Sequence, residues 1–131
     1  MLLSANLYAG EIAVIVNETG PLTEISEADI REIYLGNIKF VKGMAVMPIH
    51  YKEGPVKDVF LSSIVGMDSK KYRLYWTKKV FQEGVSLPAS QNSPSLIMLL
   101  VTKDAGAIGY VPISEMSGVK GIKVITKIKG E

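Results

Sequence analysis

The chain has 131 residues, of which 47% are hydrophobic and 21% charged, a composition typical of one globular domain rather than of a disordered segment. It contains no cysteine and a single histidine, which excludes a disulfide scaffold, a thiolate zinc site, a cysteine nucleophile and a histidine-rich metal centre. The formal net charge of +2 is too small to indicate a nucleic-acid-binding protein. Composition therefore predicts a cofactor-free α/β domain.

The first residues suggest a processed leader. Residues 2–9 read LLSANLYA, an apolar stretch with small residues near its end, which resembles the end of a secretory signal peptide cut at Ala9 or Gly10. The positively charged start of such a peptide is missing, and the alternative is that the segment leads directly into the first strand. We expect residues 1–10 to be a signal-peptide remnant or leader and residues 11–131 to form one domain. No apolar run reaches the roughly 18 residues that a membrane-spanning helix needs.

The first half of the chain predicts a strand, a helix and a second strand. Glu11–Val16 is rich in β-branched residues and predicts a strand buried on both faces. Ser26 with Asp29 three residues later forms a capping-box pattern, which predicts a helix that stops at Gly36. Ala45–Ile49 predicts the second strand. This order predicts a right-handed crossover between two parallel strands.

The second half predicts three more apolar helical segments and two strands. Their expected ranges are 55–66, 68–84, 93–101, 107–111 and 122–128. The segment at 93–101 is apolar nearly all round, so we expect a deeply buried helix, with a buried strand as the alternative. In the last segment lysines alternate with apolar residues, which is typical of a strand at the edge of a sheet.

Four segments in chain order resemble one protein family. Ile33–Phe40 (IYLGNIKF) is similar to the element IYLGKIKKW of the phosphate-binding proteins of ABC transporters, and Ala105–Val111 (AGAIGYV) is similar to their PGAIGYV. Pro48–Phe60 (PIHYKEGPVKDVF) resembles the segment in which that family has an arginine, a Gly-Ser-Gly-Thr helix start and a phenylalanine. Tyr75 and Trp76, followed by Phe81, resemble the YW…IF stretch of its short members.

The resemblance implies an α/β fold: a single lobe of the type II periplasmic-binding-protein-like fold, with a mixed, mostly parallel sheet flanked by helices. It implies a non-enzymatic, periplasmic or secreted solute-binding protein, reduced to one lobe, that binds a small anion such as phosphate weakly or through an oligomeric cleft. The alternative is an interaction module without a transport role, which self-associates or binds a protein partner in place of the second lobe. Neither hypothesis involves nucleic acid, a cofactor or a transmembrane segment.

The candidate ligand-binding residues lie where the second strand leads into the next helix, a usual position for a ligand crevice in α/β proteins. They are Tyr51, Lys52, Glu53, Gly54 and Lys57. By the resemblance, Tyr51 stands where the family has its arginine, and the family's serine and threonine hydroxyls are missing. A lysine here supplies a point charge rather than the fork of an arginine, so tight binding in the family manner is not expected.

Other residues that could carry chemistry are assigned structural roles. His50 has no second histidine to share a metal and is expected to make a polar contact at a strand end. Trp76 and its neighbouring tyrosines are expected in the core. Four acidic residues near the first helix fit its dipole better than a metal site: Glu24, Glu27, Asp29 and Glu32. No catalytic residue and no metal ligand is predicted.

Overall fold

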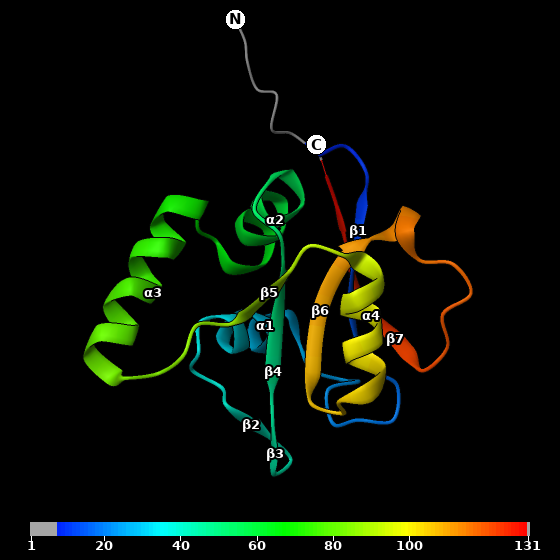
Figure 1. The fold of residues 1–131 in the computed structure, drawn as a ribbon, viewed down its shortest axis with the longest axis horizontal. Coiled ribbons are helices and arrows are strands. Elements are labelled where there is room, and N and C mark those ends of the chain that lie inside the picture. The colour runs from blue at the N-terminus through cyan, green and yellow to red at the C-terminus, as the bar shows by residue number, and fades with distance from the viewer. Residues whose placement is uncertain (1–7, 131) are drawn as a thin grey trace, which may run out of the picture.

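The computed structural model of the chain describes residues 8–130, which form a five-stranded sheet with helices on both faces (Figure 1). In sheet order the strands are β5 (Ala89–Gln91), β4 (Met47–Tyr51), β6 (Ala107–Pro112), β1 (Glu11–Asn17) and β7 (Ile122–Lys129). β4 is parallel to β5 and β6, whereas β1 is antiparallel to β6 and β7. Four strands therefore run in one direction and β1 in the other, which confirms a mixed sheet, with two parallel and two antiparallel pairings.

Helices cover the sheet unequally. α4 (Pro94–Lys103) packs alone on one face, which Figure 1 shows toward the viewer. The other face is covered by α1 (Glu27–Tyr34), α2 (Pro55–Phe60) and a π-helical turn (Leu61–Val65). α3 (Ser69–Glu83) stands to one side of the sheet and contributes Tyr72 and Trp76 to the same core (Figure 1). Side chains of β1 alternate between these two cores, as the period of a strand requires. The prediction that β1 is buried on both faces is confirmed.

α1 begins and ends as the sequence predicts. The Ser26 hydroxyl accepts a hydrogen bond from the Asp29 amide at 3.1 Å, and the Asp29 carboxylate accepts one from the Ser26 amide at 3.2 Å. Ile30, Ile33 and Tyr34 are buried. The chain then turns through Gly36, whose φ of 77° is a conformation that glycine adopts without strain.

The predicted parallel crossover from β1 to β4 is wrong. β6 lies between these strands, and since β4 is parallel and β1 antiparallel to β6, the two run in opposite directions. β1 pairs along both edges with β6 and β7, which come from the end of the chain. The connection after β1 must therefore pass β6 before the chain forms β4, the next strand of this sheet. The parallel crossover is formed instead by β4, the helical segment 55–83 and β5.

The apolar segment after Ser93 forms a helix, α4, but it is not buried all round. Leu96 and Leu99 are 37% and 48% exposed, because α4 is the outermost layer on its face of the sheet. Three short strands were not predicted: β5 and the hairpin strands β2 (Phe40–Val41) and β3 (Met44–Ala45). The hairpin turns through Lys42 and Gly43, both with positive φ, as two-residue hairpin loops require.

Both ends of the described chain lie at the same edge of the sheet (Figure 1). The Gly130 amide donates a hydrogen bond of 2.8 Å to the Gly10 carbonyl, and Tyr8 packs against the core. Most of the leader expected at residues 1–10 lies outside the described residues. Among the described residues, β7 pairs only with β1, which confirms the lysine-rich edge strand. Within residues 8–130, no helix has the length and apolar character needed to span a bilayer.

Candidate functional site

The candidate residues lie at the edge of the sheet where its parallel strands end. β4 ends at Tyr51, β5 at Gln91 and β6 at Pro112, and α2 begins at Pro55 directly after β4. Gly54 joins β4 to α2 with a φ of 140°, a conformation that favours glycine. Two openings flank this junction, one on each side of Glu53.

The first opening, here called the edge pocket, has a volume of about 290 Å³. It is lined by Tyr8, Tyr51, Lys52, Glu53, Gly54, Pro55, Val56, Pro112, Ser114 and Glu115. Burial, and then the negative charge of Glu115, raise the pKa of the Tyr51 phenol, and the Lys52 ammonium lies 5.9 Å from the centre of the Tyr51 ring. With one lysine against two carboxylates, the edge pocket offers an anion little net attraction.

The second opening, here called the inner pocket, has a volume of about 260 Å³ and lies between α2 and α3. It is lined by His50, Glu53, Lys57, Ser69, Tyr72, Arg73, Trp76, Thr77, Leu87, Pro88 and Ser90. Its two cations outnumber its one carboxylate. Hydroxyl groups from α3 and β5 add donors that a small oxyanion could use.

Lys57 and Glu53 form the central contact of the inner pocket. Their Nζ and Oε2 atoms are 2.5 Å apart, and Ser69 donates a second hydrogen bond of 3.4 Å to the other Glu53 oxygen. The hydrogen bond from Lys57 is the main reason that the pKa of Glu53 lies below its usual value. The Lys57 side chain is only 11% exposed, whereas that of Glu53 is 71% exposed. A buried cation is therefore neutralised by a carboxylate that is free to move into solvent.

A chain of hydrogen bonds forms the floor of the inner pocket. The Tyr72 hydroxyl donates to the Tyr34 carbonyl at 2.7 Å, so it must accept from His50 Nε2, which lies 2.8 Å away. His50 Nδ1 then accepts from the Tyr110 hydroxyl at 2.7 Å. Burial, and then the positive charge of Lys57, lower the pKa of His50 to about 3. His50 is thus a neutral imidazole with both nitrogens bonded, consistent with the expected polar contact.

The tyrosines and tryptophan of α3 also serve the core. Trp76 Nε1 donates to the Tyr34 carbonyl at 3.2 Å, and the Tyr75 hydroxyl donates to the Leu35 carbonyl at 2.6 Å. These carbonyls end α1 and have no partner within that helix. The core assignment of Trp76 is confirmed, and α3 provides the cap for the end of α1.

The structure divides the five candidate residues between the two openings. Tyr51, Lys52 and Gly54 line only the edge pocket, Lys57 lines only the inner pocket, and Glu53 lines both. The sequence interpretation missed four further polar residues of the inner pocket: Ser69, Arg73, Thr77 and Ser90. The spacing of Glu53 and Lys57, four residues apart, was a signal for their pairing, but no local pattern connects them to β5 or α3.

Metal binding finds no support in the part of the chain that the structure describes. Within residues 8–130, no group of three or more histidine, cysteine, aspartate or glutamate side chains is placed to hold an ion. Among the acidic residues near α1, Asp29 instead serves its capping box, and Glu27 and Glu32 accept surface hydrogen bonds.

Three solved structures that share this fold are described as phosphate-binding or phosphate-transport proteins. A protein from Clostridium perfringens, assigned as a phosphate ABC transporter substrate-binding protein and solved with bound phosphate, matches with a TM-score of 0.66 and 18% identity over 90% of this chain and 46% of its own. An ABC-type phosphate transport receptor from Vibrio cholerae matches with a TM-score of 0.64 and 17% identity over 95% of this chain and 50% of its own.

A third structure, described as a possible phosphate-binding protein from Planctomyces limnophilus, has a TM-score of 0.60 and 10% identity over 91% of this chain and 42% of its own. The chain spans about half the length of these structures, so its fold is that of one lobe of a phosphate-binding protein. No family model and no curated protein matches the sequence.

Proposed function

We propose that the chain is a non-enzymatic solute-binding lobe that takes a small tetrahedral oxyanion, with phosphate as the first candidate, into the inner pocket. The observation that carries this proposal is the buried Lys57 ammonium, which meets the exposed Glu53 carboxylate beside the ends of β4 and β5. The fold shared with phosphate-binding proteins supports the choice of anion. Binding is weak, because the site has no buried arginine fork to hold the anion.

In this proposal Glu53 occupies the position that the anion takes. Its carboxylate is the partner of Lys57, yet most of its side chain is in solvent, so it can leave at small cost. An arriving oxyanion replaces one charge-assisted bond to Lys57 with another and gains the Arg73 guanidinium and the nearby hydroxyls. Glu53 therefore competes with the anion, and Lys57 attracts it.

Two substitutions with opposite effects test the proposal. Thermal unfolding of the wild-type chain is followed in rising phosphate and sulfate, against chloride at the same ionic strength. We expect both oxyanions to raise the melting temperature, since a ligand at 100 times its dissociation constant stabilises by about 2.7 kcal/mol. Glu53→Gln should bind phosphate more tightly, and Lys57→Gln should abolish the shift.

Lys52→Gln is the matched control, because it removes one positive charge from the edge pocket and leaves the inner pocket intact. An unchanged phosphate affinity in Lys52→Gln supports the inner pocket. A loss of affinity in Lys52→Gln but not in Lys57→Gln would place the anion in the edge pocket. No melting shift in the wild type or in Glu53→Gln at millimolar phosphate would overturn anion binding altogether.

The same family likeness supports export of the chain to the periplasm or the cell exterior. Residues 1–10 are then removed in whole or in part. Cell fractionation, with mass measurement of the recovered chain, tests both points: a full-length chain confined to the cytosol would contradict them.

A further inference from the structure

α3 has two apolar faces, and only one of them is used by the fold. Tyr72 and Trp76 point into the core and are 5% and 4% exposed. Leu74 lies between them in sequence and so faces the opposite way, and it is 61% exposed. Phe81, seven residues further on, lies two turns along the same outward face and is 89% exposed. Two large apolar side chains therefore form a ridge directed away from the core.

Lysines flank this ridge. Lys70 and Lys71 lie one turn before Leu74, and Lys78 lies one turn after Leu74 and one turn before Phe81. All three lysines are exposed. The outward ridge of α3, defined by these five residues, combines an apolar centre with positive charge along its sides.

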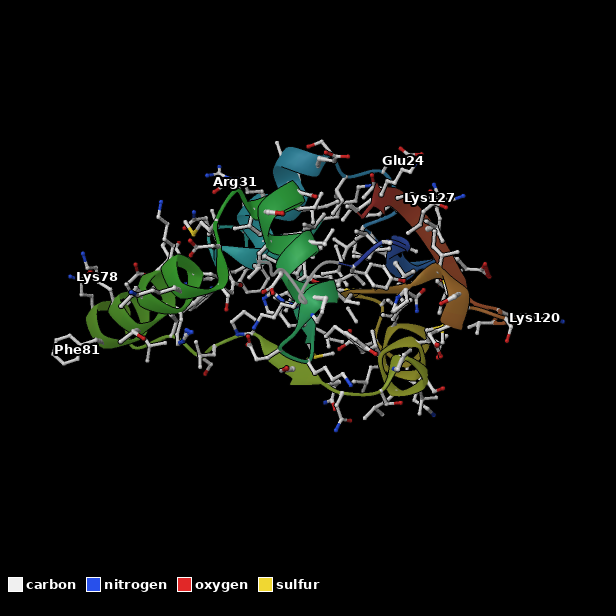
Figure 2. The ribbon with its side chains drawn as sticks, turned by 90° about the horizontal axis from the view of Figure 1, so that it is seen from above. Glu24, Arg31, Lys78, Phe81, Lys120 and Lys127 are labelled. Atoms are coloured by element: carbon white, nitrogen blue, oxygen red, sulfur yellow. The ribbon has the colours of Figure 1, made fainter. Side chains whose placement is uncertain are left out.

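The charge of the chain is concentrated on this helix. α3 contains five of the 15 basic residues and one of the 13 acidic residues, a net charge of +4 that leaves −2 for the rest of the sequence. The one carboxylate of α3, that of Glu83, accepts from Lys79 at 3.3 Å on the side toward the core. Figure 2 shows Lys78 and Phe81 projecting from the far end of α3, opposite to Lys120 and Lys127.

We propose that the outward ridge of α3 docks on the surface of an anionic lipid bilayer, with the helix parallel to the membrane plane. Exposed leucine and phenylalanine side chains enter the boundary between head groups and acyl chains, and the flanking lysines contact the lipid phosphates. Exposed apolar side chains flanked by lysines on one helix suit an anionic bilayer, because its phosphates and its apolar interior lie side by side along the whole helix. The two apolar residues of the ridge line neither pocket of the candidate site. The proposal therefore does not depend on the proposed anion binding.

The test is cosedimentation of the full chain with vesicles. Vesicles of phosphatidylcholine alone are compared with vesicles that also contain phosphatidylglycerol, in low and in high salt. We expect binding only to the anionic vesicles, weakened by salt. The variant Lys70→Gln/Lys71→Gln/Lys78→Gln should bind on the order of 100-fold more weakly, since each lysine near an anionic leaflet contributes about a fivefold factor. Leu74→Ser/Phe81→Ser should also lose binding, and both variants change exposed residues only.

Two control variants match these changes elsewhere on the surface. Lys120→Gln/Lys127→Gln/Lys129→Gln removes the same charge from the region of β7, and Leu96→Ser/Leu99→Ser removes the exposed leucines of α4. Both controls should bind as the wild type does. Equal loss of binding in the β7 variant would overturn the proposal, because it would show attraction by net charge alone. Absence of vesicle binding in low salt would overturn the proposal as well. Retention of the chain on polyglutamate, without vesicle binding, would show that the ridge binds an acidic protein instead.

Discussion

The Nδ1 atom of His50 lies 2.7 Å from the hydroxyl oxygen of Tyr110, and this buried hydrogen bond joins β4 to β6 beyond the point where their backbones pair. The ladder between these strands includes Met47 with Ala107 and Pro48 with Ile108. Further along, the Tyr34 hydroxyl lies 2.9 Å from the Ile49 carbonyl and 3.1 Å from that of Ile108. Side chains therefore hold the strands together next to the candidate site.

The neutral state of His50 predicts a loss of stability in acid. Its pKa is about 3 in the folded chain, against an ordinary value of 6.5, so below pH 6.5 the unfolded chain binds a proton that the folded chain does not. Stability is unaffected by this group above pH 6.5 and falls by about 1.4 kcal/mol per pH unit as the pH drops toward 3. Urea unfolding between pH 6.5 and 5 measures this slope.

Three tyrosines face His50, and burial raises the pKa values of Tyr34, Tyr72 and Tyr110 away from that window. The fourth charged or titratable neighbour is Lys57, whose positive charge acts on His50. The pKa of Glu53 is lowered, so the contribution of Glu53 to stability is lost only below this pH window. His50→Gln can still form hydrogen bonds but does not titrate, so the slope should vanish in that variant. The same slope in His50→Gln would show that another group is responsible.

Removal of the Tyr110 hydroxyl should destabilise the chain by about 1–3 kcal/mol, because it leaves a buried acceptor on His50 without a donor. Urea unfolding of Tyr110→Phe at pH 8 measures the cost. Tyr75→Phe is the control, since the half-buried Tyr75 hydroxyl caps the Leu35 carbonyl near the surface. A cost for Tyr110→Phe no greater than that for Tyr75→Phe would contradict a special role for the His50 network.

The capping box of α1 should contribute measurably to stability. Ser26→Ala removes the acceptor for the Asp29 amide and should lower the free energy of unfolding by about 1 kcal/mol. Ser95→Ala is the comparison, because Ser95 is exposed in the first turn of α4 and its change slightly favours the helix. If the two variants unfold at the same urea concentration, the box adds nothing.

Local signals in the sequence were sufficient to predict most elements of the fold. The Ser26 and Asp29 pair, the glycines that end helices and the alternating lysines of β7 each depend on neighbours a few residues apart. The direction of β1 relative to β4 could not be obtained this way. It is decided by pairing with β6 and β7, strands more than 90 residues away along the chain.

The candidate site was predictable only in part for the same reason. The stretch from Tyr51 to Lys57 is continuous in sequence, and a rule for α/β proteins places it at the end of a strand. Its division into two pockets depends on Arg73 and Ser90, which α3 and the short β5 bring to Lys57. The burial of Lys57 likewise depends on a distant residue, Tyr72 of α3, whose ring centre lies 5.9 Å from Lys57 Nζ.

Gly36 should be among the positions least tolerant of a side chain, for two separable reasons. Its φ of 77° strains any other residue, and a Cβ atom there would lie 2.6 Å from the Trp76 ring. Gly43 in the β2–β3 turn has a similar φ of 80° and nothing within 4 Å of its Cβ position. Gly43→Ala therefore measures the backbone strain alone, about 1 kcal/mol.

Gly36→Ala should cost at least twice as much, since Trp76 must move away from the Tyr34 carbonyl that it caps. Urea unfolding of both variants, with Trp76 fluorescence as the probe, gives the difference, and equal costs would mean that the ring yields freely.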